Sequence, residues 1–130
     1  MPAIYLDSSA IVKLVIAEPQ SSALRKFLRR RRPLLSSALA RTEVLRAVLG
    51  EGERGITRAR VVLARLDLVG VNDRVLEAAG ELLPTELRSL DAIHLATARQ
   101  LGTDLGYVVT YDDRLSRAAG LLGLATAAPA

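Results

Sequence analysis

Four separate segments of this sequence carry the acidic residues best suited to chemistry: Asp7, Glu43, Asp91 and Asp112. Carboxylates that crowd together resist ionisation, and a divalent cation bound among them relieves the repulsion. Ligand sets made only of oxygen select hard ions such as Mg²⁺ or Mn²⁺. Such an ion can activate a water molecule and neutralise a phosphodiester. The pattern predicts metal-assisted hydrolysis, provided that the fold brings the four acids together.

Short apolar runs that alternate with helical segments must position these acids. We expect strands at 3–6, 34–36, 68–71 and 107–110, and a last edge strand at 124–127. We expect helices at 10–17, 21–32, 37–49, 56–66, 73–83, 89–100 and 113–119, with Ser36 or Ser37, Asn72 and Ser89 as N-caps. Strands alternating with helices form βαβ units. The predicted fold class is therefore α/β, a parallel sheet flanked by helices, in a single domain over residues 1–130.

The acids fall where such a sheet binds ligands. The carboxyl ends of parallel strands share one edge, and ligands bind beyond it. Asp7 directly follows the first expected strand, and Asp112 comes two residues after the fourth. Asp91 lies in the first turn of a helix, and Glu43 lies within a helix among alanine and valine, where its charge needs compensation. We therefore expect the four acids to converge at this edge.

Each acid also has a purely structural interpretation. Asp7 and Asp112 are good N-cap residues, and Asp91 suits the positive end of a helix dipole. Glu43 could face the solvent or pair with Arg46. On the residues alone, both interpretations stay open.

Composition narrows the class of protein. A length of 130 residues fits one compact domain, and half of the residues are apolar. The absence of cysteine excludes disulfides and thiolate metal sites, and a single histidine excludes a His-rich zinc site. A net charge of +4 with abundant arginine permits binding to nucleic acid. The apolar run at 10–17 is too short to span a membrane, so we expect a soluble, cytoplasmic protein with no membrane partner.

The segments around the four acids resemble the motifs of PIN domains. Residues 4–10 (IYLDSSA) resemble the opening strand of that family, and residues 42–44 (TEV) its second acidic position. Residues 90–96 (LDAIHLA) resemble the third position and are the most specific segment, and residues 109–112 (VTYD) resemble the fourth. In order and spacing, the resemblance extends over about residues 3–115.

The resemblance implies a fold, an activity and partners. PIN domains are parallel sheets flanked by helices that cut RNA with Mg²⁺ or Mn²⁺, so Asp7, Glu43, Asp91 and Asp112 are expected to be both catalytic and metal-binding. Ser9 and Thr110 match hydroxyl positions that support the acidic pocket. This short, single-domain chain resembles the bacterial VapC toxins of that family. The resemblance implies a homodimer that cleaves RNA and is neutralised by a small VapB-type antitoxin. The alternative is a non-catalytic PIN domain that binds RNA or protein.

Several other residues have expected roles. Because side chains alternate along an extended chain, Asp112 is expected in the pocket and its neighbour Asp113 at the start of the next helix, where it could serve as a cap. His94 is expected to be a packed core residue rather than a general base. Residues 29–32 (RRRR) either follow an RNA backbone or stabilise a helix end. Possible RNA contacts are Arg41, Arg46 and Arg114.

Overall fold

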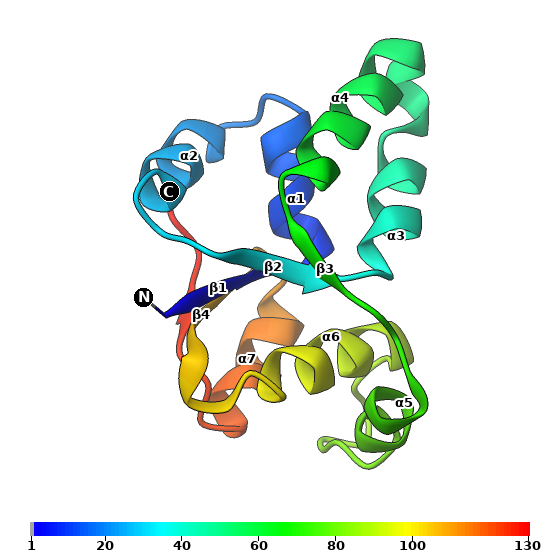
Figure 1. Ribbon diagram of the computed structural model, residues 1–130, viewed down its shortest axis with the longest axis vertical. Helices are drawn as coiled ribbons and strands as arrows, with labels where there is room; N and C mark the ends of the chain where they lie inside the picture. The colour runs from blue at the N-terminus through cyan, green and yellow to red at the C-terminus, as the bar shows by residue number, and fades with distance from the viewer. Residues whose placement is uncertain (1) are drawn as a thin grey trace.

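The computed structural model describes residues 2–130 and consists of one five-stranded sheet covered by helices (Figure 1). The strand order is β3-β2-β1-β4-β5, and every neighbouring pair is parallel. The strands are β1 (Ala3–Leu6), β2 (Leu34–Ser37), β3 (Asp67–Val69), β4 (Leu105–Val109) and β5 (Thr126–Ala127). All carboxyl ends therefore meet at one edge, which confirms the expected α/β class.

Helices cover both faces of the sheet (Figure 1). One face is covered by α1 (Ser8–Val15), α2 (Ser21–Leu28), α3 (Ala40–Ala47) and α4 (Gly52–Ala64). The other is covered by α5 (Asp73–Gly80), α6 (Ser89–Arg99) and α7 (Asp113–Leu121). Two short 3₁₀ turns, η1 (Leu49–Glu51) and η2 (Gly102–Asp104), lie in the connections.

The central strand β1 is buried on both faces because its side chains alternate between two cores. Ile4 and Leu6 pack into the core beneath α1 to α4. Tyr5 packs into the core beneath α6 and α7, together with Leu95 and Leu115. This double burial accounts for the continuous apolar run that follows the N-terminus, and it fixes the end of β1, where Asp7 stands.

Several helix and strand boundaries differ from those expected. The helix expected at 37–49 is only Ala40–Ala47, because β2 continues to Ser37 by pairing with Val69 of β3. The expected strand at 68–71 is Asp67–Val69, and the helix expected to reach residue 83 ends at Gly80. Pairing between β2 and β3, which are distant in sequence, sets the limits of these two strands, and local sequence patterns do not contain that information.

Helix starts also deviate from the expected positions. The first helix begins at Ser8, because the Asp7 carboxylate accepts a hydrogen bond from the backbone of Ala10. Ser89 was expected as an N-cap but is the first helical residue of α6, and Arg88 precedes it without a capping side chain. Asn72 caps α5 as expected, since its side chain accepts from the backbone N–H of Val75.

Candidate active site

Asp7 lies at the carboxyl end of β1 and is almost completely buried. Its Oδ1 accepts hydrogen bonds from the Ser9 hydroxyl (2.6 Å) and from the Ala10 backbone (3.0 Å), and its Oδ2 accepts one from Thr110 (2.5 Å). Burial raises the pKa of Asp7, although these hydrogen bonds act to lower it. The fold thus holds this carboxylate in one orientation, and its burial raises the free energy of the ionised form.

Ser9 and Thr110 connect Asp7 to the end of β4. The Ser9 hydroxyl also accepts from the backbone N–H of Tyr111 at 2.9 Å, and the Thr110 hydroxyl accepts from the backbone N–H of Asp112 at 3.0 Å. Each hydroxyl thus donates to Asp7 and accepts from the segment that follows β4. This network sets the relative positions of Asp7 and Asp112.

Asp112 is the N-cap of α7, so of the two roles expected for Asp113, capping or beginning the helix, Asp113 has the second. Its Oδ1 accepts from the backbone N–H groups of Arg114 (2.9 Å) and Leu115 (3.2 Å). The N-cap is the last extended residue before a helix, and the extended chain ends at Asp112 rather than one residue later. Asp113 is the first residue of α7 and is exposed.

Asp91 lies in the first turn of α6 and is partly buried. Burial raises its pKa, and the negative charges of Asp112 and Asp7 raise it further. His94 and Arg88 oppose that shift. Asp7 and Asp112 follow the neighbouring strands β1 and β4, and Thr110 contacts both, so these two acids share the carboxyl edge of the sheet. Asp91, from a third segment, is near enough for their charges to raise its pKa.

Glu43 points from α3 towards α6 and does not pair with Arg46. Its Oε1 accepts from the Ser8 hydroxyl at 2.6 Å and lies 2.6 Å from Nε2 of His94. Burial acts to raise the pKa of Glu43, but the hydrogen bonds from His94 and Ser8 outweigh it and lower the pKa. These two contacts supply the compensation that a carboxylate in this neighbourhood needs.

His94 is buried, as expected, yet it is also a polar link that the sequence analysis did not anticipate. Its Nδ1 lies 2.7 Å from the Tyr5 hydroxyl, and burial raises the pKa of Tyr5, so this hydroxyl remains a donor. Since a carboxylate can only accept, Nε2 carries the proton directed at Glu43. A chain of hydrogen bonds therefore runs from Tyr5 through His94 to Glu43. In the sequence, the position of His94 one helical turn after Asp91 was the feature that pointed to a polar role for it.

The acidic edge can be compared with what a metal ion requires. Among residues 2–130, no three acidic or histidine side chains are gathered tightly enough to form a complete ligand cage. Mg²⁺ does not need one, because it is commonly held by one or two carboxylates and keeps several waters. The donors are carboxylate oxygens, and their mutual repulsion raises the pKa of Asp91. The residues present therefore fit a hydrated divalent cation.

The arginines expected to contact RNA lie on the two helices that follow the carboxyl ends of β2 and β4. Arg41 and Arg46 are exposed on α3, and Arg114 is exposed on α7. Within the described chain, none of the three takes part in an ion pair. Their guanidinium groups are therefore available to an external anion.

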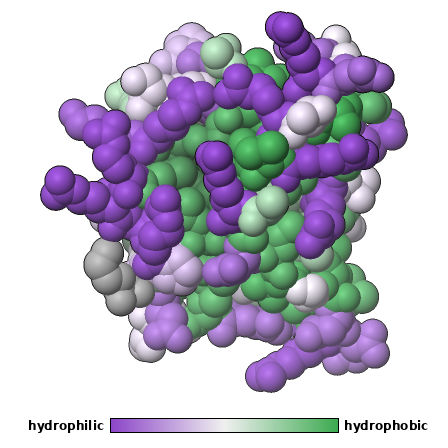
Figure 2. All heavy atoms as spheres, turned by 45° about the horizontal axis from the view of Figure 1, so that its top comes forward, coloured by the Kyte–Doolittle hydropathy of each residue, from purple (hydrophilic) through white to green (hydrophobic). Residues whose placement is uncertain are grey.

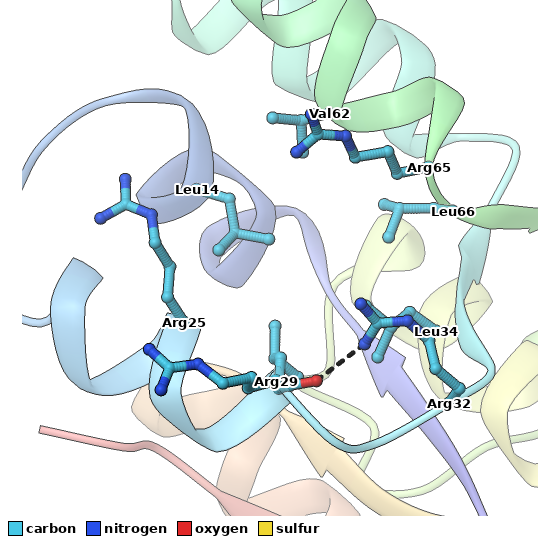
Figure 3. A pocket seen from close by; sticks show the side chains of 9 residues that line it. Leu14, Arg25, Arg29, Arg32, Leu34, Val62, Arg65 and Leu66 are labelled. Atoms are coloured by element: carbon cyan, nitrogen blue, oxygen red, sulfur yellow. Dashed lines mark hydrogen bonds between the residues drawn. The ribbon is translucent and has the colours of Figure 1, made fainter.

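A cavity of about 450 Å³ lies away from the acids among α1, α2, β2 and α4 (Figure 3). Arg25, Arg29, Arg32 and Arg65 surround its apolar lining. Viewed from the side of α1, α2 and α4, apolar residues lie between long polar side chains (Figure 2).

In the arginine run at residues 29–32, Arg31 donates to the carbonyl of Phe27 and Arg32 to that of Leu28, at 2.6 and 2.7 Å. These contacts support the interpretation that the run stabilises the end of α2.

Comparison with known proteins identifies the family. The sequence model of the PIN domain matches residues 4–121, nearly the whole chain. The chain belongs to the PIN-domain family. Among characterised PIN-domain relatives, it is 62% identical over 129 residues to Ribonuclease VapC46 of Mycobacterium tuberculosis, covering 99% of both chains. It is 41% identical over 131 residues to Ribonuclease VapC47 of the same species, covering 97% of this chain and 96% of the relative. It is thus a PIN-domain protein of the VapC ribonuclease type.

Solved structures share the PIN fold. The chain resembles VapC20 of Mycobacterium tuberculosis, described as a toxin that cleaves the sarcin–ricin loop, with a TM-score of 0.75 and 18% identity over 88% of this chain and 94% of that one. It also resembles a chain of a toxin–antitoxin complex from Klebsiella pneumoniae, with a TM-score of 0.72 and 20% identity over 98% of both chains. In the part of the chain that the structure describes, no helix is long and apolar enough to cross a bilayer.

Proposed function

We propose that this VapC-type ribonuclease cuts RNA with a Mg²⁺ or Mn²⁺ ion held by Asp7, Asp91 and Asp112, with Glu43 as the fourth catalytic acid. The observation that carries the proposal is the placement of Asp7 and Asp112 beyond the neighbouring strands β1 and β4, joined through Thr110, with Asp91 close enough for their charges to raise its pKa. The identity to ribonucleases over the whole chain supports an RNA substrate. When bound, such an ion activates water and neutralises the charge of a phosphodiester.

The residues of the chain have distinct parts in this proposal. Ser9 and Thr110 hold the Asp7 carboxylate in a fixed orientation, so little rearrangement is needed when the site is loaded. Glu43 has a lowered pKa and is ionised at neutral pH, so it can accept a hydrogen bond from the attacking water and orient it. Arg41, Arg46 and Arg114 are free to contact phosphates of the RNA.

Purified protein incubated with total RNA tests the activity. We expect endonucleolytic fragments with Mg²⁺ or Mn²⁺ and no fragments with EDTA, and sequencing the 5′ ends of the fragments gives the cleavage positions. Cleavage that continues at full rate in EDTA would disprove the metal-dependent mechanism. RNA retained on the protein without cleavage, in the presence of either metal, would support the alternative of a non-catalytic binding domain.

We also infer that a small VapB-type antitoxin neutralises this protein and that the protein acts as a homodimer. Two solved structures with the same fold support a protein partner: the toxin–antitoxin complex from Klebsiella pneumoniae and VapBC2 from Rickettsia felis. Expression of the chain alone should stop growth, and expression together with the adjacent small reading frame should restore it. Growth arrest that the adjacent frame does not relieve would contradict this partner. Light scattering of the purified toxin measures the dimer directly.

A further inference from the structure

A smaller cavity, of about 300 Å³, opens beside Asp91 between the start of α6 and the exposed side of α7. Part of its lining is apolar and comes from Pro84, Leu87, Ala118 and Leu121. Leu121 is 71% exposed, so its side chain is accessible to a ligand that enters the cavity. We call this cavity the α6–α7 pocket.

The charged lining of the α6–α7 pocket is mostly positive. Arg88, Arg114 and Arg117 line it together with Glu86 and Asp91. None of the three arginines forms an ion pair within residues 2–130. Arginine matches phosphate bidentately and also stacks on flat rings. An apolar floor beside unpaired arginines therefore suits a ligand that has both a flat ring and a phosphate.

The location of the pocket identifies the ligand further. Asp91 belongs both to the pocket lining and to the acidic edge, and the backbone N–H of Arg114, another lining residue, donates to the Asp112 carboxylate at 2.9 Å. A group bound in the pocket therefore lies next to the bond that the acids would cleave. The volume is at the lower end of the range for small-ligand sites, about 300–1,000 Å³, which suits one unpaired nucleotide and not a duplex.

We propose that the α6–α7 pocket binds the nucleotide adjacent to the scissile phosphate of single-stranded RNA. The base lies on Leu87, Ala118 and Leu121, and Arg114 and Arg117 bind its phosphate. Arg88 and Glu86 can donate to and accept from the edge of the base, so the pocket contributes to the choice of cleavage sequence. This inference rests on the proposed ribonuclease activity and adds a substrate subsite to it.

Binding measured without cleavage tests the pocket separately from the activity. A fluorescein-labelled single-stranded RNA 12-mer of mixed sequence is titrated onto full-length Asp7→Asn protein, with and without the added pair Arg114→Gln and Arg117→Gln. The matched control carries Arg60→Gln and Arg99→Gln, which remove the same charge from exposed positions outside this pocket. We expect the pocket pair to weaken binding by about tenfold or more and the control pair by less than about threefold. Equal weakening by both pairs would overturn the proposal.

Cleavage of a randomised RNA library tests whether the pocket recognises the base beside the cut. In the wild-type background, Leu121→Asp places a charge on the floor at an exposed position, so the fold should be kept. We expect it to reduce the base preference at one position beside the cut, while Arg60→Gln leaves the preference unchanged. An unchanged preference, or arginine variants that bind RNA normally but escape the antitoxin, would assign the pocket to another ligand and overturn the proposal. Failure of wild type to cut RNA at all would refute the proposed activity, while the binding assay would still decide on the pocket.

Discussion

Burial of the Asp7 carboxyl group has opposite effects on stability and on the proposed activity. Its pKa in the folded protein is raised by burial. A group of this kind contributes most to stability below its unfolded pKa, and that contribution is lost as the pH rises through the folded pKa. Burial of Asp7 therefore makes the metal-free protein less stable at neutral pH than in acid, while the proposed catalysis requires the ionised carboxylate.

We predict that Asp7→Asn abolishes RNA cleavage and stabilises the fold in EDTA at pH 7. Asn caps a helix about as well as Asp, so the start of α1 should persist. Each unit by which the pKa is raised corresponds to about 1.4 kcal/mol, and the advantage should shrink as the pH falls, because the raised pKa leaves the folded wild-type carboxyl protonated by about pH 4, where an ordinary Asp titrates. Urea unfolding at both pH values measures the effect. An advantage that is the same at both values would show that the buried charge is not its cause.

The adjacent residues Asp112 and Asp113 should differ sharply in function. Asp112 is close enough to Asp91 to raise its pKa, whereas Asp113 is exposed at the start of α7. We predict that Asp112→Asn lowers the cleavage rate about a hundredfold or more, in line with about 3 kcal/mol of lost transition-state stabilisation. Asp113→Asn should stay within about twofold of wild type. Thermal unfolding should show both variants folded, and cleavage lost only in Asp113→Asn would reverse the assignment.

At the scale of elements, the chain from Tyr5 through His94 to Glu43 joins β1, α6 and α3. Tyr5 and His94 are both buried, so neither has water as an alternative partner. We predict that Tyr5→Phe lowers the free energy of unfolding by about 1–3 kcal/mol, because it leaves Nδ1 of His94 unsatisfied. Tyr107→Phe, at an exposed position of β4, is the control and should change it by about 0.5 kcal/mol or less. Equal effects in urea unfolding would mean that the link does not stabilise the protein.

The stability that Glu43 contributes to this network depends on pH. Its pKa is lowered in the folded protein, so its contribution to stability is present above its unfolded pKa and is lost as the pH falls through the folded value. The signs for Glu43 and Asp7 are therefore opposite. Removing His94 or Ser8 takes away the groups that lower the pKa of Glu43, whereas the Ser9 and Thr110 hydroxyls lower the pKa of Asp7.

The sequence predicted elements more reliably than it predicted their ends or their polar contacts. The α/β class, the parallel sheet and the placement of Asp7, Asp91 and Asp112 at one edge follow from apolar runs and the residues after them. The end of β2 at Ser37 depends on pairing with β3, and the contact of Glu43 with His94 crosses from α3 to α6. Contacts between segments so distant in sequence leave no periodic pattern, so residue types alone could not reveal them.

For the molecule as a whole, a bound ion should act as a stabilising ligand. A ligand that binds only the folded state raises the free energy of unfolding, by about 2.7 kcal/mol when its concentration is a hundred times the dissociation constant. We predict that millimolar Mg²⁺ or Mn²⁺ raises the melting temperature of wild type and leaves that of Asp7→Asn nearly unchanged. Calorimetric scans with Na⁺ at matched ionic strength control for screening. An identical shift in both proteins would indicate nonspecific ion binding instead.

The order of the strands has a consequence for synthesis of the protein. The central strand β1 comes first in the chain, but its neighbour β4 and the edge strand β5 come last, and the backbone of Thr110 donates to the carbonyl of Ala127. The ribosome therefore reaches Asp112, and the segment that holds Thr110 against Asp7, only after most of the sheet has been made. A nascent or prematurely terminated chain lacks this part of the acidic edge. Under the proposed mechanism, which needs Asp112, cleavage of RNA cannot begin before translation of the chain is nearly complete.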